Sequence, residues 1–521
     1  MEEKKTINII GSGIGGLFCG ALLSKHGFKV KVFEARQHIG GYAGKWKRKD
    51  YTFEASLHEM NGFYPDDKKL RTFRYLDLFK RVKFLKIPSL YTSLFSDGSS
   101  FSVPHNYDKF LEKLIEEFPK EKNGIISVMN NIKKTQEHSL AFLREKNRFK
   151  AFFDTPTKYP YLMKNLFSSA YSVIFKKIKN PKARMIIAQI YNYFSDSLKK
   201  LNFIYFTVMY SYMNGSYWIS GTSASLSYEL AKIITENGGE VYTSKKIVKV
   251  LFDKKKKAIG VKCENGEEFY SNLTICNSPL KYTIENIIGK DNIPIISRLK
   301  ASSVKSSMSI FSIYIGMDID VSKLGIEDYC YTINDVEDLN ELETKEDLND
   351  FSKKTLILVS YRLDDSLCDK RKTVVNISTP SNIKYWEKFE TKEEYRKEKE
   401  RVANIILDRV ESKFKGFREH IEIMEIGTPI TMRKYSNNTD GAVYGASQKL
   451  SQSNIFRFGN EIKKRNLYFS GSWVNPGGGI SGVVISAIIT TELILKRYKI
   501  KAEFDNFIEP RLLKEDEIVG S

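Results

Sequence analysis

A glycine-rich turn followed by an acidic residue is the part of this chain whose residue types and spacing most clearly predict chemistry. The turn Gly11-Ser12-Gly13-Ile14-Gly15-Gly16 follows segment 6–10, whose apolar and β-branched residues are typical of a buried parallel strand. Glycine at the corner lets the backbone approach a pyrophosphate, and the amides that begin the next helix favour its negative charge. Gly16 allows that helix to lie close to the strand.

The acidic residue is Glu34, at the end of a second predicted strand over 29–33. Its distance from the turn is that expected of a carboxylate that binds ribose hydroxyls, and an acid there disfavours a 2′-phosphate. Ala35 and Arg36 follow directly, and we assign them to the same cofactor site. Strand, helix, second strand and acid occur in the order of a dinucleotide-binding unit. The alternative is a turn that packs a helix and binds nothing.

A second glycine-rich segment lies near the other end of the chain. A predicted strand ends at Phe469, Gly471 and Ser472 follow it, and the run Pro476-Gly477-Gly478-Gly479-Ile480 comes next. Backbone without side chains indicates close approach to a bound ligand, although a plain turn has the same composition. Together, the two segments predict one cofactor held by both ends of the chain.

Composition narrows the class of protein. The chain has 521 residues, 41% of them apolar and 13% aromatic, and a formal net charge of +20, which suits a basic globular enzyme of more than one domain. Lysine is spread along the sequence without a dense arginine segment, so we do not expect a nucleic-acid partner. An anionic membrane surface and an ordinary solvated, lysine-rich surface both remain consistent with this charge.

Cysteine and histidine give no sign of a disulfide framework or a metal site. The five cysteines include no Cys-x-x-Cys pair, and the six histidines lack ligand spacing, which fits a reducing compartment. Segment 1–5 leads straight into the first strand, so we expect no signal peptide, and we interpret 480–495 as a domain helix rather than a membrane span. The expected location is cytoplasmic, with a peripheral position at the inner face of a membrane as an open possibility.

The middle of the chain divides into three segments of different character, 68–215, 216–295 and 296–424. We expect a helix over 225–237, a strand over 241–252, and a hairpin turning at Asn265-Gly266. Segment 68–215 is basic, aromatic and predicted to be helical, which suits an apolar channel, a membrane-facing surface or a plain core. The predicted organisation is 1–67, 216–295 and 425–500 for the cofactor domain, 68–215 and 296–424 for the substrate region, and 501–521 as a tail.

The glycine segments, taken with Gly40-Gly41 and the run Gly441-Ala442-Val443-Tyr444-Gly445, resemble a known family. The chain is similar to the phytoene desaturase family, which includes carotenoid isomerases and retinol saturases, over nearly its whole length. The resemblance implies an α/β fold: a Rossmann-like FAD-binding domain of the two-dinucleotide-binding-domain flavoprotein type, with an inserted α+β substrate domain. It also implies bound FAD, an apolar lipid substrate, peripheral membrane attachment, and desaturation, saturation or isomerisation of carbon–carbon bonds by hydride exchange with the flavin.

The resemblance also assigns residues to the site. Gly40 and Gly41 would lie near the flavin end, and backbone at Val248 near the adenine, unless Val248 is an ordinary buried strand residue. Gly471 and Ser472 would contact the pyrophosphate or ribityl chain, and Gly478, Gly479 and Ile480 would lie against the flavin. His58 and Glu59 are candidates for proton transfer, and the alternative is a structural or solvent-facing histidine. Ser56, in place of glycine, and Trp473-Val474-Asn475 depart from the family pattern.

Two other classes of function stay open at this point. One is a flavin amine oxidase, which would act on C–N bonds in an aromatic-lined pocket with a polar end. The other is a non-enzymatic prenyl-lipid-binding protein of the same fold, against which the complete dinucleotide motif argues. The sequence does not specify the direction of reaction or the electron partner, for which oxygen, a quinone and a reduced carrier all remain open.

Overall fold

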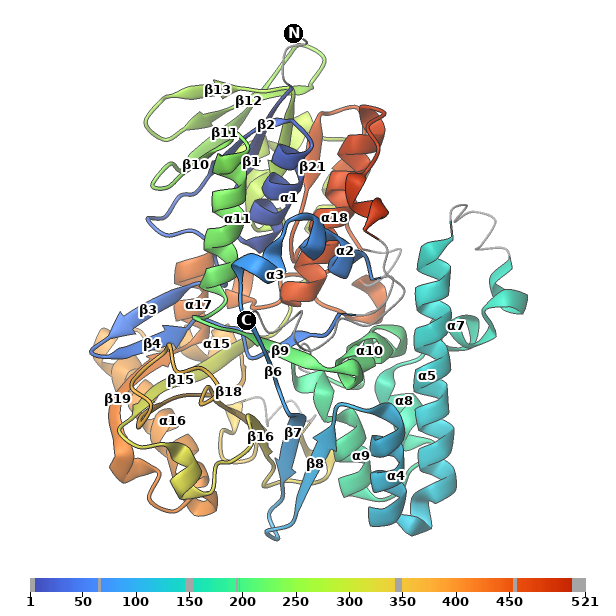
Figure 1. The fold of residues 1–521 in the computed structure, drawn as a ribbon, viewed down its shortest axis with the longest axis vertical. Coiled ribbons are helices and arrows are strands. Elements are labelled where there is room, and N and C mark those ends of the chain that lie inside the picture. The colour runs from blue at the N-terminus through green and yellow to red at the C-terminus, as the bar shows by residue number, and fades with distance from the viewer. Residues whose placement is uncertain are drawn as a thin grey trace.

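A six-stranded, mainly parallel sheet forms one end of the molecule in the computed structural model, which describes residues 5–63, 67–145, 154–193, 195, 197–342, 349–452 and 457–507 (Figure 1). Across the sheet, its strands are β10 Glu240–Tyr242, β2 Lys29–Phe33, β1 Thr6–Ile10, β14 Leu273–Cys276, β21 Leu467–Phe469 and β20 Glu461–Ile462. Only the β20–β21 pair is antiparallel. The helices α1 Ile14–Lys25, α11 Ala224–Glu236 and α18 Gly479–Arg497 pack together over it, with α1 between the other two.

Alternation of side chains along the central strands explains why both faces of this sheet are covered. Ile9 and Val32 pack in the core that includes α1, α11 and α18, whereas their neighbours Ile10 and Phe33 pack in a second core. That second core includes the meander β11 Ile247–Phe252, β12 Ala258–Cys263 and β13 Glu268–Tyr270. These strands therefore read as continuous apolar runs, as buried parallel strands do.

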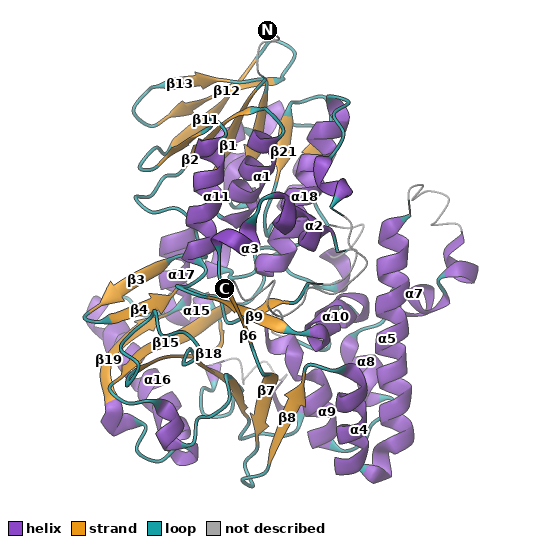
Figure 2. Cartoon of the chain, in the orientation of Figure 1, coloured by secondary structure: helices purple, strands orange, loops and turns teal. Residues whose placement is uncertain are grey.

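A seven-stranded sheet forms the opposite end of the molecule (Figure 2). In order, its strands are β19 Ile421–Gly427, β15 Ser309–Met317, β18 Thr373–Ser381, β17 Leu356–Ser360, β16 Cys330–Ile333, β7 Ser89–Leu94 and β8 Ser100–Pro104. The helix α16 Lys392–Lys413 begins at a capping box between Thr391 and Glu394 and packs its Val402, Ile406 and Val410 into the core of this sheet. The small helix α17 Pro429–Ser436 contacts β15 and β19, and α15 Ile383–Trp386 packs against α17. Two other small helices, α13 Ile295–Ser302 and α14 Leu339–Leu342, lie elsewhere in the fold.

Helices beside the seven-stranded sheet build a third region, visible on the right of Figure 1. They are α4 Tyr107–Glu117, α5 Lys122–Arg144, α7 Pro160–Asn165, α8 Ala170–Phe175, α9 Pro181–Ala188 and α10 Phe203–Met209. Shorter elements join the regions: α2 Lys68–Tyr75, α3 Leu78–Arg81, α12 Leu280–Tyr282, the hairpin β3 Lys45–Arg48 and β4 Tyr51–Glu54, and the sheet β5 Met60–Asn61, β9 Ser216–Ile219 and β6 Phe84–Lys86.

The structure differs from the sequence expectations at two places. The strand expected over 241–252 is two strands, β10 and β11, because the chain turns at Ser244 with a φ of 53° and leaves the parallel sheet. Segment 68–215 is not helical throughout, since β7 and β8 complete the seven-stranded sheet and β7 pairs in parallel with β16. Such pairing over a long sequence separation leaves no local signal. The α/β fold with a Rossmann-like domain and an inserted α+β region is confirmed.

Candidate functional site

One large cavity, of about 2490 Å³, runs between the parallel sheet and the two regions below it. Its first part is formed by the turn after β1 and by Glu34, its middle by the start of α18, and its far part by α5, α7 and α10. Typical small-ligand pockets occupy about 300–1,000 Å³, so this cavity has room for a dinucleotide and a long second molecule together.

The turn after β1 fits a pyrophosphate because its glycines leave no space for side chains. A Cβ added to Gly11 would lie 2.6 Å from the carbonyl oxygen of Asn277, and one added to Gly15 would lie 2.9 Å from the Cα of Gly471. Gly11 also has a φ of +96°, which favours glycine. The backbone amide of Gly40 donates to the Ser12 carbonyl at 2.9 Å, which fixes the second glycine pair beside the turn. The two ends of the chain therefore meet at one narrow cradle.

Glu34 lies at the end of β2 and faces this cradle. Its carboxylate accepts hydrogen bonds from the backbone amide and hydroxyl of Ser12, at 3.0 and 2.7 Å, and from the amide of Arg36 at 2.9 Å. These donors hold one carboxylate beside the turn, in the place where a ribose would follow a pyrophosphate. Lys246, at the turn between β10 and β11, and Ile247, the first residue of β11, also line the cavity.

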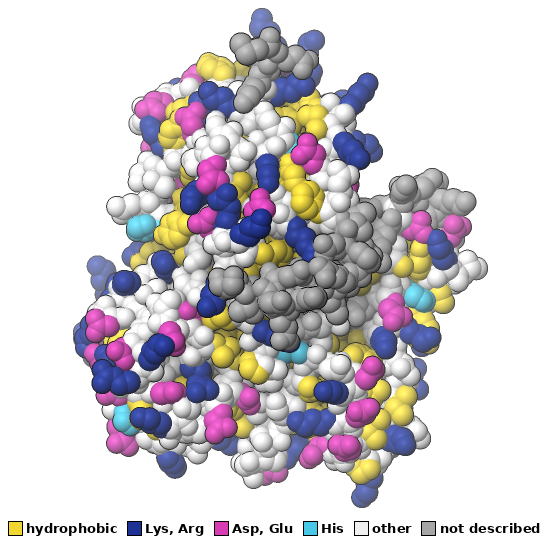
Figure 3. Space-filling model, viewed as in Figure 1, with side chains coloured by type: hydrophobic (Ala, Val, Ile, Leu, Met, Phe, Trp, Pro, Cys, Tyr) yellow, Lys and Arg dark blue, Asp and Glu magenta, His cyan; other side chains and the backbone are white. Residues whose placement is uncertain are grey.

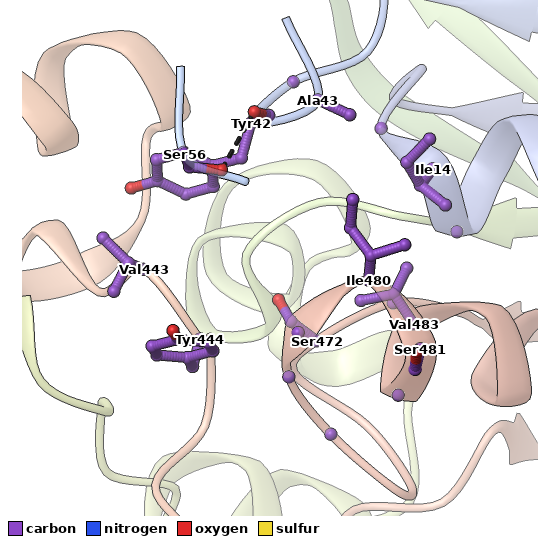
Figure 4. A pocket seen from close by; sticks show the side chains of 18 of the residues that line it. Ile14, Tyr42, Ala43, Ser56, Val443, Tyr444, Ser472, Ile480, Ser481 and Val483 are labelled. Carbon is purple, nitrogen blue, oxygen red and sulfur yellow. Dashed lines mark hydrogen bonds between the residues drawn. The ribbon is translucent and has the colours of Figure 1, made fainter. Parts of the chain in front are cut away.

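The second glycine-rich segment lies across the cavity from Tyr42 and Ser56, which flank the hairpin of β3 and β4 (Figure 4). In Figure 4, Ile480 and Val483 of α18 point from the first turns of this helix into the open space, toward the side on which Ile14 lies. Gly471, Gly477 and Gly479 all have positive φ, at 103°, 112° and 74°. A Cβ on Gly478 would meet the Tyr444 carbonyl at 2.3 Å. Exposed amides at the start of a 19-residue helix thus face the cavity, where they favour negative charge.

Most of the residues predicted for the cofactor site line this cavity. They are Gly11, Gly13, Ile14, Gly15, Glu34, Ala35, Arg36, Gly40, Gly41, Gly471, Ser472, Gly478, Gly479 and Ile480. Gly16 does not line it: a Cβ there would lie 2.2 Å from the Gly11 carbonyl, so this glycine serves the packing of α1. Val248 does not line it either, because it lies beyond Ile247 on β11, where it is half-buried.

The two candidates for proton transfer, His58 and Glu59, both line the cavity but differ in protonation. Burial lowers the pKa of His58 to about 4, with an opposing hydrogen bond to Asn376, so its ring is neutral near pH 7. Burial raises the pKa of Glu59 to about 7, against weaker lowering contacts from Ser216 and Tyr193. The Glu59 side chain is 6% exposed and neither oxygen has a partner at hydrogen-bonding geometry. Glu59 is therefore a carboxyl able to give or take a proton near neutrality.

The two departures from the family pattern have ordinary structural explanations. Ser56 is not among the described residues with positive φ, and its hydroxyl donates to the Tyr42 carbonyl at 3.0 Å (Figure 4). A serine therefore fits this backbone and adds one contact to the cavity wall. The indole of Trp473 is 6% exposed and donates to the Asn438 side chain at 2.9 Å, which closes the wall beside Ser472.

The far part of the cavity is walled by apolar side chains of the helical region. They are Leu140, Phe142, Leu162, Met163, Leu166, Ile204, Val208 and Met209. Three aromatic residues of the same region, Tyr193, Tyr205 and Tyr212, also line it. Tyr191, Phe203, Phe206 and Tyr210 are buried in the core instead, and Phe194 lies outside the described residues. Segment 68–215 thus supplies both a core and an apolar channel.

Sequence reasoning missed two polar residues that line the site, Asn277 and Lys69, and one that lies behind its wall, Arg457. Asn277 donates to the carbonyls of Gly11 and Gly13 at 3.3 and 3.2 Å, and its place directly after a parallel strand was a usable signal. Lys69, on α2, lines the cavity although it is only 2% exposed. Arg457 is buried beside Gly477. Neither cation belongs to a local motif, so only the fold brings them to the site. Among the described residues, no group of three or more His, Cys, Asp or Glu could hold a metal ion.

The parallel sheet, the glycine cradle and the acid after β2 define a dinucleotide-binding flavoprotein, with room beside the cofactor for an apolar molecule. The chain belongs to the family described as flavin containing amine oxidoreductase, whose model matches residues 14–495. FAD is its cofactor, as the sequence predicted, and the chain is an oxidoreductase. This membership does not support the alternative of a flavin-free lipid-binding protein.

Curated relatives and solved structures agree with this assignment. Prolycopene isomerase of Daucus carota is 28% identical, with 92% of this chain and 78% of that protein covered. All-trans-retinol 13,14-reductase of Danio rerio is 24% identical, with 94% and 86% covered. A putrescine oxidase variant shares the fold, with a TM-score of 0.65, 13% identity, and 95% and 99% of the two chains covered. The predicted resemblance to the carotenoid isomerase and retinol saturase family is confirmed.

Proposed function

We propose that this protein is an FAD-dependent oxidoreductase that desaturates, saturates or isomerises carbon–carbon bonds of an apolar polyene, isoprenoid or retinoid-like lipid. The observation that carries the proposal is one continuous cavity, which joins a dinucleotide cradle to a channel walled by apolar helix residues. A short polar amine would leave most of that channel empty. The names of the carrot isomerase and the zebrafish reductase support the same substrate class.

In this proposal, FAD lies along the first two parts of the cavity. The turn from Gly11 to Gly15 would hold the pyrophosphate, Glu34 the adenosine ribose, and the start of α18 the flavin. Ile480 and Val483 would support the ring by contact, since both side chains point into the space (Figure 4). When bound, FAD supplies hydride exchange at a carbon–carbon bond. The apolar wall of α5, α7 and α10 excludes water and orients the chain of the substrate.

Glu59 would move the proton that accompanies the hydride. Addition of two hydrogens across a double bond needs one hydride and one proton, and removal returns both. A neutral Glu59 can donate the proton, and its carboxylate can accept one, because its pKa of about 7 lies near the working range. We assign His58 to a positioning role, since its ring is neutral and its backbone carbonyl accepts from the Tyr329 hydroxyl.

We also propose that the channel opens toward an anionic membrane surface. Leu140, Met163 and Phe167 are exposed by 44%, 48% and 74%, and the first two also line the cavity. Lys164, beside Met163, could pair with acidic headgroups. Elsewhere, Lys and Arg are interspersed with Asp and Glu over the face drawn in Figure 3. The substitution Phe167→Asp should weaken binding to vesicles that contain phosphatidylserine, and unchanged binding would contradict this surface. A peripheral location on the cytoplasmic face remains part of the same proposal.

Among the described residues, α18 is the one helix long and apolar enough to cross a membrane. Its residues Val484, Ala487 and Ile488 are buried in the core shared with α1, and its first turn forms part of the site. This packing supports its interpretation as a domain helix. The electron partner stays unassigned among oxygen, a quinone and a reduced carrier.

The deciding experiment is a substrate screen with FAD-loaded protein under defined redox conditions. We expect turnover of polyenes or retinoids, followed by chromatography of the products, and no oxidation of polyamines. Amine oxidation without any change in polyenes would favour the alternative, to which the family description and the putrescine oxidase likeness point. Comparison of Glu59→Gln with Glu59→Asp then tests the proton step, because only the aspartate variant should retain a pH-dependent rate.

A further inference from the structure

Two buried cations stand on either side of the start of α18, and the proton-transfer chemistry uses neither. Lys69 reaches this place from α2, and Arg457 from the segment before β20. Lys69 lies against Ser481, in the first turn of α18, and Arg457 lies against Gly477, just before that turn. No carboxylate forms a salt bridge with either one among the residues that the structure describes.

Lys69 is held by neutral oxygens. Its ammonium donates to the Asn61 carbonyl at 2.7 Å, to the Asn61 side-chain oxygen at 3.0 Å and to the Gly62 carbonyl at 3.0 Å, and it lies 3.5 Å from the Ser481 hydroxyl. The Ser481 hydroxyl donates in turn to the Asn61 side chain. Burial lowers the pKa of Lys69 to about 8, while the charge of Asp67 raises it slightly. Lys69 thus remains mainly charged at neutral pH, without an ion-pair partner.

Arg457 is buried more completely on the other side. It is 4% exposed and donates from Nη2 to the Ser447 carbonyl at 3.0 Å and to the Gln448 side chain. Its Nε and Nη1 atoms are buried without a partner, as is Nε2 of Gln448. A Cβ on Gly477 would lie 3.2 Å from Nη2 of Arg457, so the guanidinium abuts the backbone of the glycine run. Burial lowers its pKa only to about 10, and the charge persists.

Burial of an unpaired cation raises the free energy of the folded protein, so we expect a bound ligand to bring negative charge close to Lys69 and Arg457. The cavity wall between them is the start of α18, whose amides add positive potential of the same sign. Hydride acceptance gives bound FAD one additional negative charge. We propose that Lys69 and Arg457 are positioning residues that hold positive potential at the start of α18 and thereby favour the reduced form of the cofactor. This inference rests on the assignment of the flavin to that part of the cavity.

The test measures the flavin midpoint potential of purified holoprotein by equilibration with reference dyes. Lys69→Met and Arg457→Met should each shift the two-electron equilibrium toward oxidised flavin by at least tenfold, which is about 30 mV. Lys69→Arg and Arg457→Lys, which keep the charge, should remain within threefold of the wild type. The matched control is Lys254→Met, which removes an exposed charge from the turn between β11 and β12 and should change nothing.

A second readout uses sulfite, which adds to flavin N5 through its sulfur lone pair and leaves a negative charge on the ring. Its dissociation constant should rise at least tenfold in the two methionine variants. If these variants fail to retain FAD, Lys69→Gln and Arg457→Gln take their place. Neutral variants that bind FAD with the potential and sulfite affinity of the wild type would overturn the proposal. Absence of FAD from the wild-type protein, seen as missing flavin absorbance, would instead overturn the cofactor assignment itself.

Discussion

Substitution of Glu59 by glutamine should stabilise the protein at alkaline pH and leave its stability unchanged in acid. Burial raises the pKa of this carboxyl from 4.5 to about 7. In that window, the folded state holds a proton that the unfolded chain has released, so the free energy of unfolding decreases as the pH rises. The rise in pKa from 4.5 to about 7 corresponds to about 3 kcal/mol in the free energy of unfolding. The protein keeps this stability below pH 4.5 and has lost all of it above pH 7.

Glutamine has nearly the same shape and no charge, so it avoids this loss. The assay is thermal unfolding of FAD-loaded protein between pH 4.5 and 8.5, followed by tryptophan and flavin fluorescence. The unfolding midpoint of Glu59→Gln should rise above that of the wild type progressively with pH. Glu116→Gln, at an exposed position of α4, provides the control and should show a constant offset. Parallel curves for Glu59→Gln and wild type would refute the reasoning, because they would mean that Glu59 ionises equally in both states.

Three further predictions concern the cradle, the channel and the joint between regions. Gly15→Ala should raise the dissociation constant for FAD at least about tenfold, because the added Cβ would lie 2.6 Å from Asn277 Oδ1. The constant is measured by flavin fluorescence. The control is Gly459→Ala, whose added Cβ would have no heavy atom within 4 Å. Val208→Trp should keep FAD but abolish turnover of long polyenes, whereas Val208→Leu should retain it, because Val208 faces the channel. Asp364→Ala should lower the free energy of unfolding by about 2–5 kcal/mol, measured by chemical denaturation. The carboxylate of Asp364 accepts from the Trp218 indole at 2.8 Å and from the Gly221 amide at 2.7 Å, and both donors would lose their acceptor. Wild-type stability of that variant would contradict the role of Asp364.

The first strand, the turn after it and the acid after the second strand were predictable because they are local. The strands expected over 6–10 and 29–33 have those bounds in the structure. Glycines in a turn and short apolar runs indicate the backbone conformation of their own segment, so they can be interpreted without knowledge of the rest of the fold. The FAD cofactor and the family followed from these segments and are confirmed.

Residues that meet only through the fold could not be predicted in the same way. Lys69 lies in a charged segment that resembles an ordinary solvated helix start, yet α2 brings it against Ser481, more than four hundred positions later in the chain. Strand β7 has few apolar residues to mark it, and its partner β16 lies far away in the sequence, where Tyr331 pairs with Thr92. Their role depends on packing between segments, for which a single sequence carries no periodic signal.

The cavity wall itself explains why the cofactor was easier to predict than the substrate. Its cofactor part comes from turns where a side chain would collide with backbone, so residue type is dictated and visible in the sequence. Its apolar part, where we propose that the substrate binds, comes from helices such as α5 and α10, where any apolar side chain of suitable volume would serve. Proteins that share a fold can therefore keep the first part and replace the second. Substrate choice should change with substitutions in the channel of α5, α7 and α10, and cofactor binding with substitutions in the glycine cradle.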